Sequence, residues 1–394
     1  MSEATETFPK LRFPKFSNPW LEKKFGQIFS ISAGGDIEHE RLHKKPSDMY
    51  RYPVFANGGK EGGLQGWTDY YREEAGCITV SGRGNLGTPV ARYQNFVPVV
   101  RLLVLRPKVT SDIFFFENAI RRIRFFVEST GVPQLTAPQI SSYKIGFPAL
   151  PEQQKIADFM GAVDERIKLL QRRRDAVARY KKGVMQRLFS QSLRFTRDDG
   201  TPFPDWEEKR LGDLVTFRSG GTPSKENAEF WGGDIPWISA SSMHSDIISN
   251  SDLCVTEFGS MNGTRTAKKG SLLLLVRGSM LYNRIPAGIC VRDVTFNQDV
   301  KALDPKPGAS ATFVLCQLRA FEHRLLSMVV GTGIGAGKLD TEDLKNFAMP
   351  IPHPDEQRKI ADALCALDAK IAAVYAQVFQ MQTFKKGLLQ QMFV

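Results

Sequence analysis

The sequence predicts an α+β protein: two β-rich α/β domains joined by two long helices that form an antiparallel coiled coil, with pseudo-twofold symmetry. Three observations lead to this fold class. Residues 148–189 recur 204 positions later with 15 identities in 42 positions and no gap. Both copies carry a heptad pattern of apolar residues, which is typical of coiled-coil helices. The region before each copy alternates short β-branched and aromatic runs with Gly, Asn and Pro turns, which indicates strands.

Two short motifs mark the repeat. The pattern P-x-x-x-E-Q-x-K-I-A-D begins at Pro148 and again at Pro352, and K-K-G follows at Lys181 and again at Lys385. Solenoid repeats have periods of only about 20–50 residues. The sequence therefore predicts two copies of one large unit, and such a molecule suits a target that itself has two halves.

We expect four segments along the chain. Residues 1–147 form the first β-rich domain and residues 148–194 the first long helix. Residues 195–350 form the second β-rich domain and residues 351–394 the second long helix.

Both β-rich domains begin alike, with a tryptophan and a charged-then-apolar run that starts at Trp20 and at Trp206. Short helices are expected late in each domain, over residues 112–126 and 311–328. The Gly/Asn/Pro turns between the other apolar runs favour strands for most of the rest.

The apolar seam of each long helix advances in alternating steps of four and three. The first seam comprises Ile156, Met160, Val163, Ile167, Leu170, Val177, Val184 and Leu188, with Arg174 and Lys181 as polar exceptions. The second comprises Ile360, Leu364, Leu367, Ile371, Val374, Val378, Met381, Leu388 and Met392, with Lys385 as the exception. A sustained period of 3.5 residues predicts helices that supercoil around a partner.

The other copy is the obvious partner for each helix. The two can pair parallel or antiparallel, and we favour antiparallel pairing because Lys181 and Lys385 would then not stack on each other. Each helix could instead pack separately on its own domain. Prolines at Pro148 and Pro352 begin both helices sharply, and acidic residues such as Glu152 favour the positive end of the helix dipole.

The net charge of +11 is concentrated in the first half of the chain. Residues 1–150 carry +6 and residues 151–190 carry +5, whereas residues 191–354 carry −1 and residues 355–394 carry +1. A surplus of this kind suits a polyanionic partner.

Composition also limits the setting in which the protein works. The five cysteines are scattered, which argues against a disulfide framework and against a structural zinc site. The longest apolar runs are too short to cross a bilayer, and the first ten residues do not resemble a signal peptide. We therefore expect a cytoplasmic protein that does not contact a membrane.

Several motif fragments are too incomplete to predict an enzyme. The G-x-G-x-x-G of residues 82–87 is not followed by the helix that a dinucleotide site needs. The glycine-rich run 331–338 has the wrong spacing for a phosphate loop, and Leu339 stands where Ser or Thr would bind magnesium. The five histidines lack ligand spacing. We predict no catalytic residue and no metal site in this chain.

The residues resemble a known family. The two repeated motifs, W-E-E-K-R-L-G from Trp206, I-P-W-I from Ile235 and N-Q-D-V-K from Asn297 make the whole chain similar to the specificity subunit of a type I restriction-modification complex. Two departures are a long approach over residues 8–20 and the Arg174 break in the first seam.

This resemblance implies two target-recognition domains, each recognising one half of a bipartite site in double-stranded DNA. It also implies that the methyltransferase (modification) subunits dock on the helices. Methylation and ATP-driven cleavage would be carried by those subunits and by restriction/translocase subunits. S-adenosylmethionine, ATP and Mg²⁺ would then belong to the partners, and this chain would need no cofactor.

Base recognition requires Arg, Lys, Asn, Gln or Ser side chains on exposed loops. The candidates in the first domain are Asn57, Lys60, Arg83, Asn85 and Arg92. Those in the second are Arg218, Lys225, Ser241, Arg277, Asn283, Arg284 and Lys338. Some of these would contact only phosphate and carry no sequence information.

Two other functions are weighed against DNA recognition. A coiled-coil protein–protein adaptor without direct DNA contact is favoured by the near-neutral second domain. A self-sufficient methyltransferase or nuclease would need a cofactor or metal constellation, which the motifs above do not supply.

Overall fold

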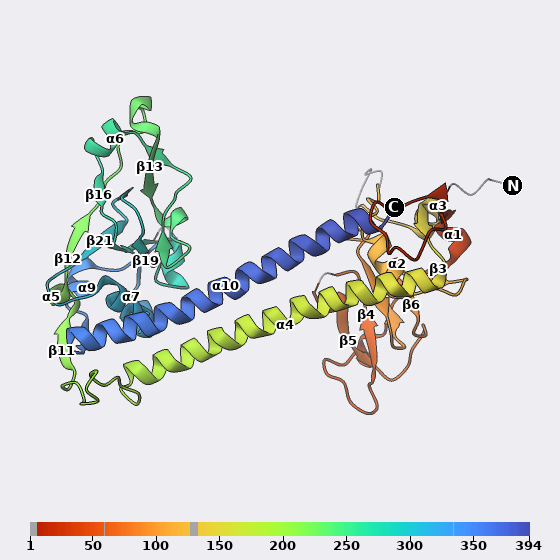
Figure 1. The fold of residues 1–394 in the computed structure, drawn as a ribbon, viewed down its shortest axis with the longest axis horizontal. Coiled ribbons are helices and arrows are strands. Elements are labelled where there is room, and N and C mark those ends of the chain that lie inside the picture. Colours follow the sequence, from red (N-terminus) through yellow and green to blue (C-terminus); the bar gives the residue numbers. More distant parts are fainter. Residues whose placement is uncertain (1–5, 59, 127–132, 334) are drawn as a thin grey trace. The chain divides into compact units, whose positions relative to one another are not determined.

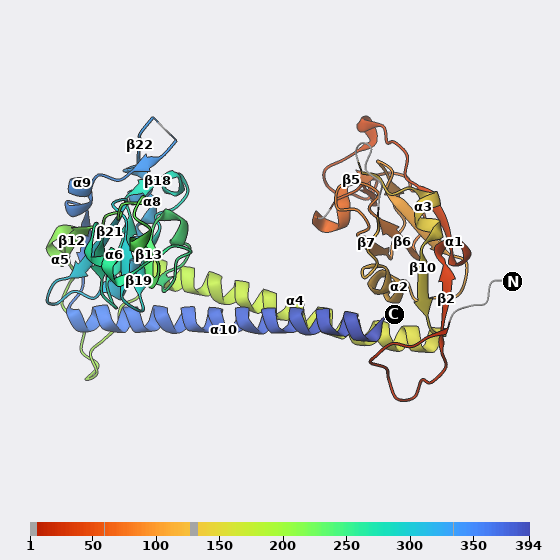
Figure 2. The ribbon, with the colours of Figure 1, turned by 90° about the horizontal axis from the view of Figure 1, so that it is seen from above.

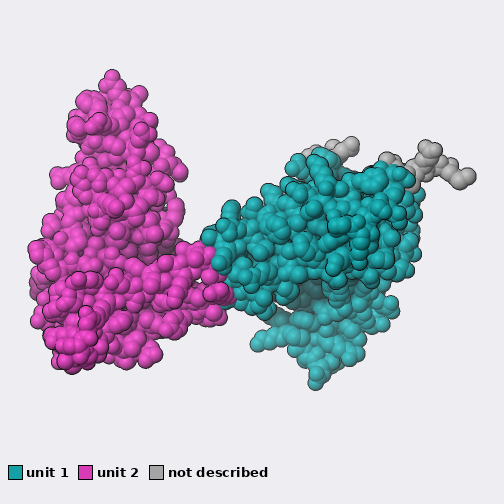
Figure 3. All heavy atoms as spheres, viewed as in Figure 1, with its two compact units in different colours: residues 1–172, 375–394 teal, residues 173–374 magenta. Residues whose placement is uncertain are grey.

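The computed structural model describes residues 6–58, 60–126, 133–333 and 335–394. The chain divides into two compact units, and each long helix contributes to both (Figures 1 and 3). Unit 1 contains residues 1–172 and 375–394, and unit 2 contains residues 173–374. This division cuts through both long helices, whereas the sequence suggested boundaries at their ends.

Unit 1 contains three small sheets. A three-stranded sheet has the order β1-β2-β10, a four-stranded sheet the order β3-β9-β6-β7, and a second three-stranded sheet the order β5-β4-β8. The strands are β1 (Glu6–Thr7), β2 (Trp20–Lys24), β3 (Phe29–Ala33), β4 (Tyr52–Phe55), β5 (Leu64–Thr68), β6 (Cys77–Val80), β7 (Pro89–Arg92), β8 (Val97–Pro98), β9 (Leu103–Pro107) and β10 (Lys144–Phe147). The short helices are α1 (Phe25–Ile28), α2 (Ile113–Ile120), α3 (Ala137–Ser142), η1 (His39–Arg41) and η2 (Lys60–Gly63).

Unit 2 is built around a five-stranded sheet of order β12-β21-β17-β19-β14, with smaller sheets β15-β13-β20-β16, β18-β23-β22 and β11-β24. The strands are β11 (Glu207–Arg210), β12 (Val215–Ser219), β13 (Trp231–Ile238), β14 (Ile247–Ile248), β15 (Cys254–Val255), β16 (Arg265–Ala267), β17 (Leu272–Leu275), β18 (Arg277–Gly278), β19 (Ala287–Cys290), β20 (Val294–Phe296), β21 (Val300–Pro305), β22 (Val330–Gly331), β23 (Gly337–Lys338) and β24 (Ala348–Ile351). The short helices are α5 (Leu211–Leu214), α6 (Glu257–Met261), α7 (Ala311–Ala320), α8 (Glu322–Ser327), α9 (Thr341–Lys345), η3 (Ala228–Phe230), η4 (Ala240–Ser242) and η5 (Ser279–Tyr282).

The two units share one plan. The strand order β3-β9-β6-β7 of unit 1 corresponds to β12-β21-β17-β19 of unit 2, in the same chain order. Helix α2 follows β9 and helix α7 follows β21, and each is N-capped by a side chain, from Asp112 and Ser310. The expected helices are shorter than the sequence suggested: α2 ends at Ile120, and residues 311–328 form two helices separated at Phe321. The duplication therefore extends from the long helices into the β-rich domains.

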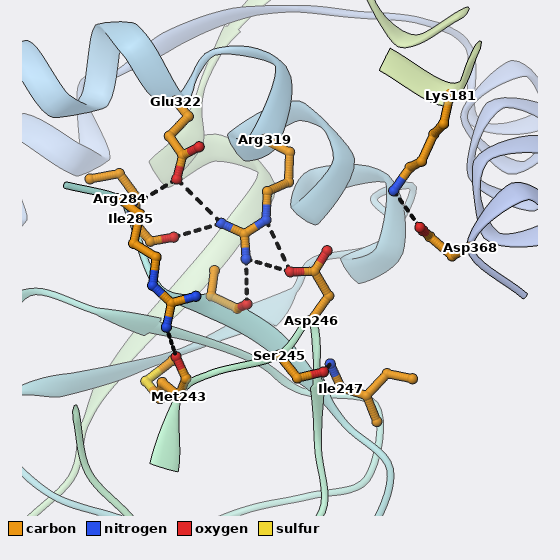
Figure 4. A network of polar contacts seen from close by, with 11 residues as sticks. Lys181, Met243, Ser245, Asp246, Ile247, Arg284, Ile285, Arg319, Glu322 and Asp368 are labelled. Atoms are coloured by element: carbon orange, nitrogen blue, oxygen red, sulfur yellow. Dashed lines mark hydrogen bonds and ion pairs between the residues drawn. The ribbon is translucent and has the colours of Figure 1, made fainter. Parts of the chain in front are cut away.

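The long helices are α4 (Leu150–Phe189) and α10 (Pro354–Met392), and they pair antiparallel. Within unit 1, Lys385 of α10 forms an ion pair with Asp164 of α4 at 2.6 Å. Within unit 2, Lys181 of α4 pairs with Asp368 of α10 at 2.6 Å (Figure 4). Moving 17 residues forward from Asp164 to Lys181 on α4 therefore means moving 17 residues back from Lys385 to Asp368 on α10. Each lysine that interrupts a seam is thus matched by a carboxylate of the other helix.

No seam position is exposed. The buried members are Ile156, Met160, Val163, Ile167, Leu170, Leu188, Ile360, Leu364, Val374, Val378, Leu388 and Met392, and the half-buried ones are Val177, Val184, Leu367, Ile371 and Met381. Arg174 is also half-buried.

The ends of the seams pack on the domains as well as on the other helix. In unit 1, Met160 and Met392 belong to one core with Trp20 and Phe115. In unit 2, Leu188 and Leu364 join the core of the five-stranded sheet. Packing on the domain, one of the two alternatives, therefore accompanies coiled-coil pairing and does not replace it. Among the residues described, no helix combines the length and apolar character that a membrane span requires.

Candidate nucleic-acid interface

The repeated E-Q motif anchors each long helix to its domain. Glu152 is buried and accepts two hydrogen bonds from Arg12, both at 2.7 Å, and a longer one from Trp20 Nε1 at 3.4 Å. In unit 2, Glu356 accepts from Arg194 at 2.8 and 3.2 Å and from Trp206 Nε1 at 3.1 Å. Hydrogen bonding to these carboxylates raises the pKa of both arginines. The most specific motif of the sequence therefore has a structural role at the beginning of each helix.

The glutamine of the motif completes this joint. Gln153 accepts a hydrogen bond from the backbone N–H of Asp112, the cap of α2, at 3.0 Å and donates to the carbonyl of Pro148 at 2.8 Å. Gln357 likewise accepts from Ser310, the cap of α7, and donates to the carbonyl of Pro352 at 3.1 Å. Each long helix is thereby linked to a short helix of its own unit, α4 to α2 and α10 to α7.

Besides the helix motif, a loop at the end of a central strand in each unit carries several of the candidate polar residues. We call residues 81–88, between β6 and β7, head loop 1. Residues 276–286, between β17 and β19, form head loop 2 and contain β18 and η5. In Figure 2, β18 and β22 lie on the side of unit 2 that is away from α10.

The two head loops present an arginine at equivalent positions. Leu135 donates its backbone N–H to Gly82 at 2.9 Å, and Leu339 donates to Val276 at 2.8 Å. Leu135 and Leu339 are 204 residues apart, the shift of the repeat, so these two bonds correspond. The next residue in each loop is an arginine, Arg83 in unit 1 and Arg277 in unit 2.

The residue before each leucine lies beside that arginine. Gln134 accepts hydrogen bonds from Nε and Nη2 of Arg83 at 3.2 and 2.8 Å. Lys338 is the cross-strand partner of Arg277 in the β18–β23 pair, and both side chains are exposed. The structure thus brings together Arg277 and Lys338, which the sequence suggested separately, and adds Gln134, which sequence reasoning missed.

Polar side chains from neighbouring segments hold each head loop in place. In unit 1, the side-chain oxygen of Asn57 accepts from the backbone N–H of Gly82 at 2.7 Å, and its amide donates to Val100. Arg121, the C-cap residue of α2, donates to the carbonyl of Pro89, the first residue after the loop, at 3.2 Å. Both ends of the Asn57 amide are therefore hydrogen-bonded within the protein, and its role in base contact stays a prediction.

In unit 2, Arg319 of α7 clamps the end of head loop 2 (Figure 4). It donates to the carbonyls of Ile285 at 2.6 Å and Ala287 at 2.7 Å, and Asp246 holds its guanidinium at 2.5 Å. Arg284 donates a hydrogen bond to the carbonyl of Met243 at 2.6 Å, so this candidate also supports the loop, and its contact with DNA stays a prediction.

Two further candidates are structural. Arg92 is only 5% exposed: it donates to Thr79 at 2.9 Å and lies over the ring of Phe55 at 3.6 Å, and burial lowers its pKa to about 10. Arg218 forms a two-pronged ion pair with Asp304 on the neighbouring strand β21. Both were expected on exposed loops, but each lies within a sheet and donates hydrogen bonds to protein atoms.

The remaining candidates stay available for contact. Exposed side chains are found at Asn85, Lys225, Ser241, Arg277, Asn283 and Lys338, and Arg83 is half-buried. The side chain of Lys60 lies outside the described residues. Asn283 follows η5 in head loop 2, whereas Lys225 and Ser241 lie on other loops of unit 2.

The described residues contain no group of three or more His, Cys, Asp or Glu side chains arranged to hold a metal ion. Residues 82–87 lie within head loop 1, and the described part of the glycine-rich run 331–338 lies within the β22–β23 hairpin. In the part of these runs that the structure describes, neither begins a helix, which is the arrangement that both nucleotide-phosphate motifs require.

Sequence comparison identifies the family. The profile described as "Type I restriction modification DNA specificity domain" matches residues 17–179 and 204–376, once for each copy of the repeat. The chain belongs to this family. The two matches begin just before Trp20 and Trp206 and end within the long helices, so each specificity domain includes part of its helix.

Curated relatives share this family. The EcoR124I/EcoR124II specificity subunit of Escherichia coli is 30% identical over 164 residues, which are 41% of each chain. The MjaVIII specificity subunit of Methanocaldococcus jannaschii is 23% identical over 308 residues, 72% of this chain and 69% of the relative. The chain spans about two fifths of the length of the first curated relatives that it matches, at 41% and 42%.

Solved structures show the same fold. The S subunit of a type I restriction-modification system from M. genitalium superposes with a TM-score of 0.62 over 98% of this chain and 99% of that one, at 19% identity. A chain from a structural study of assembly and conformational transition in a type I system gives a TM-score of 0.56 at 17% identity. The α+β fold of this chain is thus shared with these solved structures over nearly its whole length.

Proposed function

We propose that this chain is the DNA-specificity subunit of a type I restriction-modification complex. Unit 1 recognises one half of a bipartite site in double-stranded DNA through head loop 1, and unit 2 recognises the other half through head loop 2. The observation that carries the proposal is the equivalent placement of Arg83 and Arg277 on corresponding loops of a duplicated specificity domain. Arginine is the side chain that most often recognises guanine in the major groove.

In this proposal the long helices have two roles. Their outer surfaces bind the methyltransferase subunits, and the length of the coiled coil sets the number of unspecified base pairs between the half-sites. Buried ion pairs and glutamine bonds at both helix beginnings suit this role, because they join each helix to its domain with many contacts.

Chemistry is assigned to the partners. The methyltransferase subunits would use S-adenosylmethionine, and the restriction/translocase subunits would use ATP and Mg²⁺. This chain would contribute recognition alone.

The direct test is to map N6-methyladenine in cells that express the chain with its methyltransferase partner. We expect one motif made of two short specified halves separated by unspecified bases. A continuous motif, or no methylation that depends on this chain, would contradict the proposal.

A further inference from the structure

We propose that Gln134 and Lys338 are specificity-determining residues, each of which sets what the arginine beside it recognises. Because they occupy the same position in the two units, they would make the two corresponding head loops select different bases. The inference rests on the proposed function, since it needs each unit to contact its own half-site.

Gln134 fixes the plane of the Arg83 guanidinium. A single oxygen, Oε1, accepts from Nε and Nη2, which form one edge of the group. The other edge, formed by Nη1 and Nη2, keeps two N–H donors side by side. That pair matches the O6 and N7 acceptors of one guanine. Gln134 is thus a positioning residue for Arg83, and head loop 1 is arranged for a single guanine contact.

Lys338 cannot position Arg277 of head loop 2 in the same way. An ammonium group has three donors and no acceptor, so it cannot orient Arg277 as Gln134 orients Arg83. Asp340, the N-cap residue of α9, holds Lys338 at 3.2 Å. Asp340 lies 204 residues after Thr136, which caps α3. The N-cap residue at this position is therefore a carboxylate in unit 2 and a neutral threonine in unit 1.

Arg277 of head loop 2 and Lys338 on the neighbouring strand β23 therefore form a pair of adjacent cations, whereas Arg83 of head loop 1 has the neutral neighbour Gln134. Two donor-only side chains side by side suit a wider row of acceptors, such as the major-groove edges of adjacent guanines. The geometry points to one specified guanine in the half-site of unit 1 and a longer guanine-rich element in that of unit 2.

Reciprocal exchange tests this assignment. The variants Gln134→Lys and Lys338→Gln are each expressed with the methyltransferase partner, and the methylated motif is sequenced. We expect each to change base preference at one or two positions of a single half-site, on the order of tenfold or more, while the other half stays the same.

The matched control is Lys269→Gln. Lys269 is an exposed lysine in the turn before β17, at the opposite end of that strand from Arg277. This variant should keep the wild-type motif. If an exchanged variant fails to fold, Gln134→Met keeps the length of the side chain but removes the acceptor, and it should relax the same position.

The outcomes separate the two proposals. A wild-type bipartite motif that both exchanges and Gln134→Met leave unchanged overturns the role of Gln134 and Lys338 but keeps the proposed function. A wild-type complex without a bipartite motif overturns the proposed function itself. A change confined to the half-site of the altered unit supports both.

Discussion

The buried ion pair between Arg194 and Glu356 should be among the contacts of unit 2 whose loss by mutation costs most stability. The Glu356 side chain is 0% exposed, and Arg194 supplies two of its hydrogen bonds. The variant Arg194→Met removes both and leaves a buried carboxylate with Trp206 and the N-terminal end of α10 as support. Removing one partner of a buried pair costs about 3–5 kcal/mol. Because Arg194 is 23% exposed and Trp206 remains, we expect the lower end, about 3 kcal/mol.

Hydrogen exchange at the first turns of α10 is the suitable assay. A chain with two units need not unfold in one step, so a local measurement is preferable to a global midpoint. A loss of about 3 kcal/mol corresponds to exchange that is roughly a hundredfold faster in this segment.

The matched control is Arg358→Met on the same helix. Arg358 pairs with Asp355 at 2.6 Å, but both side chains are exposed, at 70% and 55%. An exposed pair of this kind contributes less than about 1 kcal/mol. If Arg194→Met accelerates exchange no more than Arg358→Met, the buried joint is not what secures the helix.

Three other results are expected. Deleting one seam heptad from each long helix should shorten the unspecified spacer in the methylated motif, and an unchanged spacer would show that the helices do not set it. Asp304 is partly desolvated, but its hydrogen bonds to Arg218 and Ser271 outweigh this and lower its pKa. The ionised Asp304 therefore stabilises the fold at any pH above the pKa that Asp304 has in the unfolded chain. This stabilisation is lost as the pH falls through the lower pKa of Asp304 in the folded chain. Acid titration should therefore destabilise unit 2 less in Arg218→Met than in the wild type. Burial raises the pKa of Cys77 to about 11 and of Cys290 to about 12, so a thiol reagent at pH 8 should modify exposed Cys365 well before either, and early labelling of Cys290 would contradict its burial.

Sequence reasoning was most successful where a periodic pattern had to be satisfied. The antiparallel pairing of α4 and α10 was anticipated from the seam lysines, and the ion pairs of Lys181 and Lys385 supply its physical reason. The same reasoning placed a polar loop with Arg83 after a strand, because glycines and an arginine between apolar runs indicate an exposed turn.

Sequence reasoning was least successful for individual polar residues. Arg83 and Arg92 look alike in the sequence, yet Arg92 is buried against Phe55. Arg218 is paired because the neighbouring strand β21 carries Asp304, two residues beyond the cross-strand partner Ala302 and 86 residues away in the chain. Gln134 had no local signal at all, since its importance comes only from its contact with Arg83. Gln134 could have been found from the repeat, because it lies 204 residues before Lys338, which was a candidate.

The sequence by itself determined that the molecule is a duplication, where the long helices begin and which of their faces is apolar, because these features are written in spacing and periodicity. Only the tertiary structure decided which segment covers the C-terminal end of each long helix. Leu11 donates its backbone N–H to Gln391 at 2.9 Å, just as Leu193 donates to Arg187 at 3.0 Å, so the N-terminal segment packs on the end of α10 as the linker packs on the end of α4. The physical reason is that hydrogen-bond partners of buried groups are chosen by proximity in space, and residues 11 and 391 are neighbours only in the folded chain.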